Sequence, residues 1–480
     1  MESHNPLDVP LPPMEPSPDH FDPDKVCNYL RIHSIRSSLM FLASCAYKEI
    51  TQGRRIRILY TLDHSSYSID IDNEPIQPEM IPQIQSKMIE FINSGHPIES
   101  FYVLKNDLIQ YFKTMNYNDK VTLLTNNKSE KIEIVKFNNF IDFSLDSQYI
   151  HDLSKLGSFD VQFSVPGFFI RYPGLLSNGV ISEWKGAPLQ HFLIMDTINW
   201  SEREVHSNSI ENLNELVNNE EFDNVNQKSI EFSFKNVTEI CDSLCRDFDK
   251  KRLITIAGPS SSGKSTFSKV ISNELTKRGY DVLIFMMDNY YLDVPDTPKD
   301  ADGKYDFESI YALHLDMMVQ HLHCLLKGES IKKRIFNFAK GIGYDHETET
   351  LSLSSNGFLI IEGINALNPV LLEKLGASLV TKIYVGPMTP ISIDSEHLFR
   401  TSDLLLIRRI IRDFHEREYS ARRVVGWWPD ISIGEARNIT PNIQYADLFY
   451  NSSLVLELPA LSAVVIPLLE QSLNSDKVEE

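Results

Sequence analysis

The sequence predicts an α/β protein in which a parallel sheet covered by helices is preceded by an N-terminal α+β domain. From Lys251 onward, short apolar runs alternate with segments of helical periodicity, which is typical of parallel strands joined by helices. Before residue 200, strand-like and helix-like segments follow no such alternation. A chain of 480 residues is also too long for one ordinary core. Two or three domains are therefore expected.

The C-terminal strands and helices are predicted from composition and period. Runs of Val, Ile, Leu and Phe indicate buried strands, and apolar side chains at three- and four-residue spacing indicate helices. The predicted strands are Leu253–Ala257, Val282–Met287, Phe358–Ile361 and Val380–Val385. The predicted helices are Lys264–Arg278, Ser309–Leu326 and Asp403–Arg417. Ligands of such sheets bind at the carboxyl ends of the strands, so the residues after each strand are candidates for function.

The chain is expected to divide into four parts. Residues 1–26 are proline-rich and mostly acidic, which favours a disordered tail. Residues 27–200 are predicted to form the α+β module, and residues 201–230, rich in Asn, Glu and Ser, a polar connector. Residues 231–480 then form the parallel-sheet domain. The elements predicted in the module include a helix at Ser37–Glu49, strands within Arg54–Asp72 and a helix at Pro78–Asn93.

Composition and charge exclude several classes of protein. The apolar content of 42% and charged content of 23% are typical of soluble globular proteins, and no run of about 18 apolar residues offers a membrane span. The net charge of −20 opposes general binding to DNA, RNA or membrane surfaces. The N-terminus lacks the features of a signal peptide, and five cysteines make no disulfide framework. A cytoplasmic location is therefore expected, with neither DNA nor a membrane as partner and with RNA disfavoured.

The most informative motif follows the first C-terminal strand and precedes a predicted helix. It matches G-x-x-x-x-G-K-[ST], in which backbone N–H groups and the positive end of the helix hold phosphates. Lys264 would reach the β- and γ-phosphates, and Ser265 would hold Mg²⁺. A simple Gly/Ser turn is the alternative. The residues expected to contact the phosphates are Gly258, Pro259, Ser260, Ser261, Ser262, Gly263, Lys264, Ser265 and Thr266.

Two acidic residues follow predicted strands. Phosphoryl transfer needs neutralised charge and a base that takes the proton of the acceptor. Asp288 follows Val282–Met287 and is the candidate general base, although an aspartate that caps a turn is the alternative. Glu362 follows Phe358–Ile361 and is the candidate acid beside Mg²⁺. A structural acid at the edge of the sheet is the alternative for Glu362.

Arginines gather on the last predicted helix. Arg408, Arg409, Arg412 and Arg417 lie there, and positions 408, 409 and 412 are neighbours at three- and four-residue spacing. This spacing predicts a cluster of guanidinium groups that meets the transferring phosphate. An exposed and merely solvated basic face is the alternative. The acidic background of the chain favours the cluster.

Taken in this order, the motifs resemble the uridine kinase and phosphoribulokinase family over residues 251–470. The segments that carry the resemblance are Gly258–Ser265, Met287–Tyr291, Tyr305–Glu308, Ile361–Gly363 and Arg408–Arg417. The resemblance implies a P-loop NTPase kinase domain that uses ATP and Mg²⁺ and phosphorylates a hydroxyl group of a small molecule, in particular a nucleoside. The roles it implies are Asp288 as base, Tyr291 near the acceptor, Glu308 at the ribose hydroxyls, and Arg409, Arg412 and Arg417 in a lid over the phosphates.

The segment expected to bind the nucleobase departs from the family. Uridine kinases carry Tyr-Asp-Phe followed closely by a histidine, whereas this chain has Phe336-Asn-Phe338 followed by Lys340. Phe336 and Phe338 keep a stacking surface, but the histidine that contacts the base has no match. Tyr419 stands where an arginine of the lid is usual. Phosphoryl transfer is therefore expected, and the identity of the acceptor stays open.

A second resemblance covers most of the chain. It is to uridine kinase-like proteins whose N-terminal domain is similar to the accessory domain of threonyl-tRNA synthetase, and it rests on His33, the Ser37–Glu49 helix and Pro166–Pro173. The editing domain of that synthetase uses an H-x-x-x-H pair, but Ser37 occupies the second position, so neither zinc nor editing is expected. The alternative function is a nucleotide-responsive RNA-binding or regulatory protein with a kinase-like sensor domain. The sequence leaves open whether the chain forms a homo-oligomer.

Overall fold

The computed structural model describes residues 9–17, 27–62, 64–145, 149–206, 209–219, 221–300, 303–388 and 391–474. The chain forms two compact units. Unit 1 comprises Met1–Phe222 and Thr389–Arg400, and unit 2 comprises Asp223–Met388 and Thr401–Glu480. The chain thus leaves unit 2 after Met388, contributes a short segment to unit 1, and re-enters unit 2 at Thr401. We call residues 391–400 the strap.

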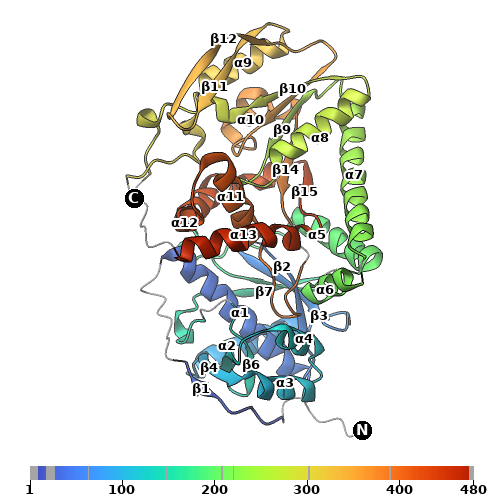
Figure 1. Cartoon of the computed structure of the whole chain (residues 1–480), viewed down its shortest axis with the longest axis vertical. Coiled ribbons are helices and arrows are strands. Elements are labelled where there is room, and N and C mark those ends of the chain that lie inside the picture. Colours follow the sequence, from blue (N-terminus) through green and yellow to red (C-terminus); the bar gives the residue numbers. More distant parts are fainter. Residues whose placement is uncertain are drawn as a thin grey trace. The chain divides into compact units, whose positions relative to one another are not determined.

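Unit 2 is built on a five-stranded parallel sheet (Figure 1). The strand order is β10 (Asp281–Met286), β13 (Gly357–Glu362), β9 (Leu253–Ala257), β14 (Val380–Gly386) and β15 (Leu448–Asn451). Every neighbouring pair is parallel, which confirms the predicted α/β fold. The four predicted strands form within one residue of their expected bounds, and β15 is an additional strand.

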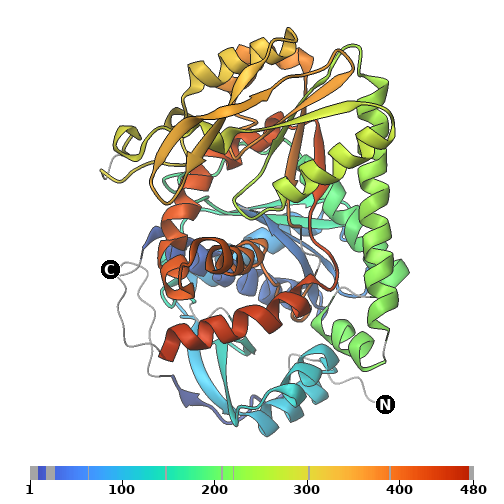
Figure 2. The ribbon, with the colours of Figure 1, turned by 45° about the horizontal axis from the view of Figure 1, so that its top comes forward.

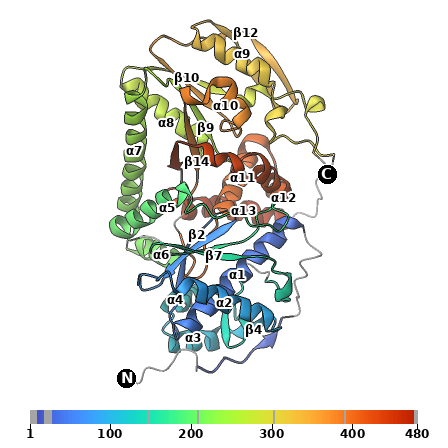
Figure 3. The ribbon, with the colours of Figure 1, turned by 180° about the vertical axis from the view of Figure 1, so that it is seen from behind.

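Alternate side chains of the central strand enter two cores on opposite faces of this sheet. The covering helices are α7 (Phe222–Arg246), α8 (Lys264–Lys277), α9 (Leu315–Leu326) and α10 (Pro369–Leu375). Ile254 and Ile256 pack with α7 and α8, whereas Leu253 and Ala257 pack with α9 and α10. The long green helix in Figure 2 is α7, and α9 and α10 lie together in Figure 3. Burial on both faces explains why these strands are continuous apolar runs.

The remaining elements of unit 2 surround the carboxyl edge of the sheet. They are the hairpin β11 (Ile331–Asn337) and β12 (Ile342–Leu351), and the helices α11 (Thr401–Arg417), α12 (Ala421–Asn438) and α13 (Glu457–Asn474). One predicted helix, Ser309–Leu326, begins only at Leu315. Ser309 Oγ accepts a hydrogen bond from Tyr311 N and caps a separate 3₁₀ turn. Serine competes in this way with helix formation.

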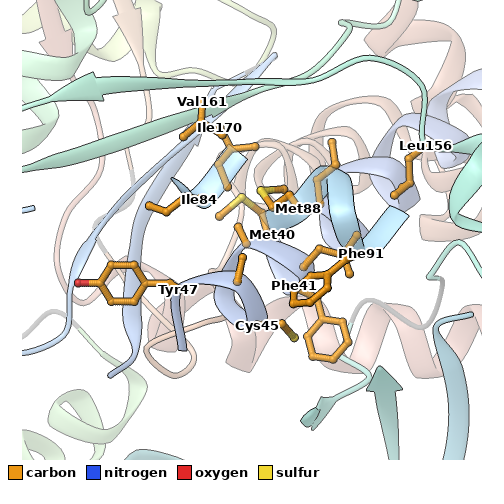
Figure 4. Packing of buried hydrophobic residues seen from close by; sticks show 14 of the residues in the cluster. Met40, Phe41, Cys45, Tyr47, Ile84, Met88, Phe91, Leu156, Val161 and Ile170 are labelled. Carbon is orange, nitrogen blue, oxygen red and sulfur yellow. The ribbon is translucent and has the colours of Figure 1, made fainter. Parts of the chain in front are cut away.

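Unit 1 contains two antiparallel four-stranded sheets and is of the predicted α+β type. The first sheet has the order β1 (Glu15–Pro16), β4 (Glu99–Leu104), β5 (Lys131–Phe137) and β6 (Phe140–Phe143), and the second has β2 (Ile56–Leu62), β3 (Ser65–Asp70), β8 (Gly167–Arg171) and β7 (Asp160–Ser164). Its helices are α1 (Asn28–Ile50), α2 (Met80–Asn93), α3 (Lys105–Thr114), α4 (Asn118–Asn126), α5 (Leu189–Trp200) and α6 (Ile210–Asn218). Met40 and Phe41 of α1 meet Met88 and Phe91 of α2 in its main core (Figure 4).

The described part of the predicted tail is ordered and packed, so the expectation of a disordered tail is wrong there. β1 pairs with β4 in antiparallel register. Val9, Leu11 and Met14 pack against the core that β4, α3 and α4 share. These apolar side chains, spaced between the prolines, cover an apolar surface that composition alone does not reveal. The other residues of the predicted tail lie outside the described residues.

Helices fill most of the predicted connector at residues 201–230. α6 lies entirely within it, and α7 begins in it. The two units divide between Phe222 and Asp223, at the start of α7. None of the helices in the described ranges combines the length and the hydropathy that a membrane crossing requires.

A buried cluster of charges fixes the strap to unit 1. Lys120 is fully buried, and its Nζ lies 2.5 Å from Asp142, 3.0 Å from Asp394 and 3.2 Å from Glu396. The guanidinium of Arg55 pairs with Glu396 at 3.1 Å. A backbone N–H of β2 also donates to a strap carbonyl at 2.8 Å. The strap is thus an integral part of unit 1, although unit 2 precedes and follows it in the chain.

Candidate active site

The Gly-rich loop runs from β9 to the first residue of α8. A Cβ at Gly258 would lie 1.9 Å from Val385 O, so only glycine fits there. Gly263 has a φ of +90°, which glycine adopts without strain. The Oγ atoms of Ser261 and Ser262 are buried and have no hydrogen-bond partner in the described structure. A loop with unpaired hydroxyl groups at the N-terminus of a helix fits bound phosphates.

The lysine and serine at the end of this loop face acidic and carbonyl oxygens. Lys264 Nζ is buried and donates to Pro259 O at 2.8 Å. Burial lowers the pKa of Lys264, although the charges of Asp288 and Glu362 oppose the shift. Ser265 Oγ donates to Glu362 Oε1 at 2.5 Å. Hydroxyl and carboxylate oxygens are ligands that Mg²⁺ prefers, so the Ser265–Glu362 pair fits this metal.

The sheet brings both predicted acids to the loop. Glu362 is the last residue of β13 and lies in register with Met286, the last residue of β10. Asp288 stands two residues beyond β10 and therefore lies at the same edge. Asp288 is half-buried, and burial raises the pKa of its carboxyl group in spite of nearby positive charges, the largest of which is that of Lys264.

Three arginines of α11 share one buried acid, and one of them reaches the loop. Asp413 is fully buried and forms ion pairs with Arg409 at 3.3 Å, Arg412 at 2.7 Å and Arg417 at 3.4 Å. Arg412 Nη1 also donates to Ser260 Oγ at 3.1 Å. The cluster therefore forms as predicted for these three arginines. Asp413 was not predicted from the sequence. Its four-residue spacing from Arg409 and Arg417 is typical of ion pairs on one face of a helix.

Arg408 does not belong to this cluster, contrary to the prediction. Its guanidinium pairs with Glu457 at the start of α13 and donates to Ser452 O at 2.9 Å. Its Nη1 also donates to the carbonyl oxygen of Ser261 at 3.4 Å. The carboxylate of Glu457 neutralises the charge of Arg408. The hydrogen bond from Arg408 to Ser261 O holds the loop in place.

The three aromatic residues predicted for the acceptor lie together. The ring centroids of Tyr291 and Phe336 are 5.7 Å apart, those of Tyr291 and Phe338 are 6.2 Å apart, and those of Phe336 and Phe338 are 5.0 Å apart. Phe336 is buried, whereas Phe338 is 54% exposed. The guanidinium of Arg417 lies 5.5 Å from the centre of the Phe338 ring. The aromatic group thus adjoins the arginine cluster.

Glu308, predicted to bind acceptor hydroxyls, lies against α12. A Cβ on Gly434 would lie 3.0 Å from Glu308 Oε2, so the glycine makes room for this carboxyl group. Burial raises the pKa of Glu308, and the charge of Arg409 opposes the shift. The next residue of α12, Glu435, is a further acid at the site, and burial raises its pKa to about 7. No motif in the sequence marks Glu435.

All the predicted site residues belong to unit 2. Most of them converge on the carboxyl edge of its sheet, through the loop, the ends of β10 and β13, and α11. Thr266 is exposed on the first turn of α8. The arrangement can hold phosphate groups, place a carboxylate as a base and surround developing negative charge with guanidinium groups.

The chain is similar to several known proteins. A model of the phosphoribulokinase / uridine kinase family matches residues 253–454. The uridine kinase of Bacillus pumilus is 30% identical over 201 residues, which are 42% of this chain and 85% of that protein. The uridine kinase of Anoxybacillus flavithermus is 27% identical over the same shares. The solved D-glycerate 3-kinase of Cryptococcus neoformans is 12% identical, with a TM-score of 0.29 and coverage of 43% of this chain and 88% of that chain.

The family match begins at residue 253, within unit 2. It therefore leaves untested the predicted similarity of residues 27–200 to the accessory domain of threonyl-tRNA synthetase. That similarity stays a prediction.

Proposed function

The chain belongs to the phosphoribulokinase and uridine kinase family, and we propose that it transfers the γ-phosphate of ATP to a hydroxyl group of a small molecule, a nucleoside in particular. The observation that carries the proposal is the convergence of the phosphate loop, Asp288 and the arginines of Asp413 at one edge of one sheet. Phosphoryl transfer requires a phosphate cradle, a base and neutralising charge. Each of the three has a candidate at this edge.

Asp288 takes the proton of the acceptor hydroxyl in this proposal. Its raised pKa makes its carboxylate a stronger base than an ordinary aspartate, because an oxygen that holds its proton more tightly also removes one more readily. Lys264, Arg417 and Arg412 are close enough to influence that pKa. They therefore also lie near the oxygen from which the proton leaves.

Positive charge on both sides of the phosphates completes the proposed site. Lys264 approaches from the loop, and Arg409, Arg412 and Arg417 approach from α11. Ser265 and Glu362 would hold Mg²⁺, which, when bound, neutralises charge on the phosphate oxygens. Guanidinium groups held in advance by a buried carboxylate need little reorganisation as charge develops on the phosphate.

The acceptor is proposed to bind between Asp288 and the aromatic group. Glu308 would accept hydrogen bonds from hydroxyl groups of a sugar, and Phe336, Phe338 and Tyr291 would stack on a planar ring. The rings are 5.0–6.2 Å apart at their centroids. This surface favours a planar aromatic ring linked to a polyhydroxylated group, as in a nucleoside.

The test measures ADP release by the full chain with ATP, Mg²⁺ and a panel of nucleosides. We expect turnover with at least one nucleoside and a fall in kcat of about 100-fold or more for Asp288→Asn, because general-base catalysis contributes roughly 10²–10⁴-fold. Asp296→Asn, at an exposed position nearby, is the matched control and should retain the wild-type rate. An Asp288→Asn variant as fast as wild type would show that another group is the base.

A further inference from the structure

Glu308, the candidate for binding hydroxyl groups of the acceptor, lies in a surface segment of unit 2. Its neighbours Tyr305 and Phe307 are 40% and 38% exposed. One tie of this segment leads to α12, where Asn438 Nδ2 donates to Asp306 Oδ1 at 3.3 Å. A carboxylate that binds a substrate beside a base must keep a fixed place, so a surface segment of this kind needs further support. Two residues of other elements provide it.

The first support is Asn365, in the turn that follows β13. Asn365 is buried, and its Nδ2 donates to the carbonyl oxygen of Glu308 at 2.8 Å. Its Oδ1 is also buried and has no hydrogen-bond partner in the described structure. A reversed amide would place two oxygens against each other, so the bond to Glu308 fixes the orientation of the amide. Asn365 therefore holds the main chain of Glu308 while it keeps an unpaired buried oxygen, which is unfavourable.

The turn that carries Asn365 also contacts the segment of the candidate base. A Cβ on Gly363 would lie 2.7 Å from the side chain of Met287, so the turn packs directly against the residue before Asp288. Gly363 N also donates to a carbonyl oxygen of β9 at 3.1 Å. One short turn fixed to the sheet thus contacts both the main chain of Glu308 and the residue next to Asp288. This turn sets the place of the hydroxyl-binding acid relative to the base.

The second support is Gly434 on α12. A Cβ at this position would lie 3.0 Å from both Cγ and Oε2 of Glu308, which is closer than ordinary van der Waals contact. Gly434 lies within the helix, and its φ is not in the left-handed region that favours glycine. Glycine is a poor helix former, so the backbone of α12 does not explain its presence. The room that it leaves for the carboxyl group of Glu308 does.

We infer that Asn365 and Gly434 are positioning residues that hold the carboxylate of Glu308 where it binds sugar hydroxyl groups of the acceptor. Asn365 acts through the main chain of Glu308, and Gly434 acts through the room that it leaves. The inference rests on the proposed function, because it takes Glu308 as part of the acceptor site. A displaced carboxylate forms longer and less well aligned hydrogen bonds, which are weaker. Preference for an acceptor with all its sugar hydroxyl groups is therefore expected to depend on both residues.

Steady-state kinetics of the full chain with ATP and Mg²⁺ test this inference. The acceptors are the best nucleoside and its analogues that lack the 2′- or the 3′-hydroxyl group. For wild type we expect kcat/KM to be about tenfold or more higher for the complete nucleoside than for one analogue, because a hydrogen bond to a charged group contributes that much. Asn365→Leu and Gly434→Ala should lose most of this preference, mainly through a higher KM for the complete nucleoside. Glu308→Ala gives the preference that remains without the carboxylate.

Two matched controls separate positioning from a merely structural role. Gly426→Ala lies on the same helix, where a Cβ meets nothing within 4 Å, and should keep the wild-type preference. Asn368→Ala removes the cap of α10, in which Asn368 Oδ1 accepts from Val370 N at 3.0 Å. This control should lower the unfolding temperature and keep the preference. Asn365→Leu and Gly434→Ala should do the opposite, because leucine also removes the unpaired oxygen and alanine favours a helix.

The possible outcomes distinguish the inference from the proposed function. A wild-type preference in Asn365→Leu or in Gly434→Ala would refute the positioning role of that residue and leave the proposed function intact. Loss of the preference in Glu308→Ala is expected. A Glu308→Ala variant that keeps the preference, or a wild type without one, would refute the inference for both residues, because the carboxylate would then bind no hydroxyl group. Absence of turnover with every nucleoside would overturn the proposed function and the inference together.

Discussion

Glu435 and Glu396 are both glutamates that face the interior, but their surroundings shift the pKa values of their carboxyl groups in opposite directions. Burial raises the pKa of Glu435 to about 7. Burial acts in the same direction on Glu396, yet the charges of Lys48, Lys120 and Arg55 hold the pKa of Glu396 well below its ordinary value. Glu435 is therefore suited to exchange a proton near neutral pH, whereas Glu396 is a permanent charge that fixes the strap.

His397 of the strap predicts a pH-dependent stability. Burial alone would lower the pKa of this imidazole, but Asp394 and Asp142 raise it to about 9, from about 6.5 in an unfolded chain. Folding thus favours the protonated form. Its contribution to the free energy of unfolding is complete below a pH of about 6.5 and is lost as the pH rises through about 9.

We expect the urea midpoint of the wild-type chain to fall over this pH window and His397→Gln to lack that part of the fall. Circular dichroism during urea titration at several pH values measures this midpoint. His415→Gln, an exposed histidine on α11, is the control and should follow the wild-type curve. A His397→Gln curve parallel to that of wild type would contradict the assigned pKa.

At the scale of elements, α11 carries most of the positive charge of the candidate site. Its arginines are held by Asp413 on the helix itself, and the helix begins directly after the strap. The strand ends define the other side of the site. The chemistry of the proposed kinase thus depends on one helix face and one sheet edge, which are local structures placed together by packing.

Asp413→Asn is expected to disturb the arginines without changing any group that touches phosphate. Removing one partner of a buried ion pair costs about 3–5 kcal/mol, and the three guanidinium groups then repel one another. Because arginines at such sites contribute roughly 10³-fold or more to phosphoryl transfer, we expect kcat to fall about 10- to 100-fold. The ADP-release assay on the best acceptor and thermal unfolding measure the two effects.

Glu416→Gln is the matched control for that substitution. Glu416 is exposed on the same helix, so its neutralisation should change neither kcat nor the unfolding temperature appreciably. If the Asp413 and Glu416 variants have the same kcat, the buried carboxylate does not organise the arginines for catalysis.

At the scale of the whole molecule, the strap links the two units through the chain. Its charged residues pair with Lys120 and Arg55 of unit 1, while Thr401, the residue after it, begins α11 in unit 2. The backbone thus joins the strap of unit 1 directly to the arginine-bearing helix of unit 2.

Lys120→Met tests how firmly the strap is held. Three carboxylates would lose their shared buried partner, so we expect unit 1 to lose about 3–5 kcal/mol of stability. Amide hydrogen exchange should become faster in residues 391–400 and in the first turn of α11. Lys131→Met, which breaks an exposed pair with Glu15, should change neither. Unchanged exchange in the strap of Lys120→Met would show that backbone contacts alone hold it.

The sequence by itself determined the parallel sheet, the phosphate loop and the position of Asp288 and Glu362. These features are local: an apolar run of set length forms a strand, and the residue after it stands at the carboxyl edge of the sheet. The arginine cluster was also predictable, because helical spacing places Arg409 and Arg412 side by side.

Only the tertiary structure decided which distant groups meet. Arg408 pairs with Glu457, and Lys120 pairs with Asp394. Each of these contacts joins residues far apart in the chain and leaves no local period or motif. The state of charge depends on the same contacts, because burial and neighbouring charges, rather than the type of residue, set whether a carboxyl group keeps its proton.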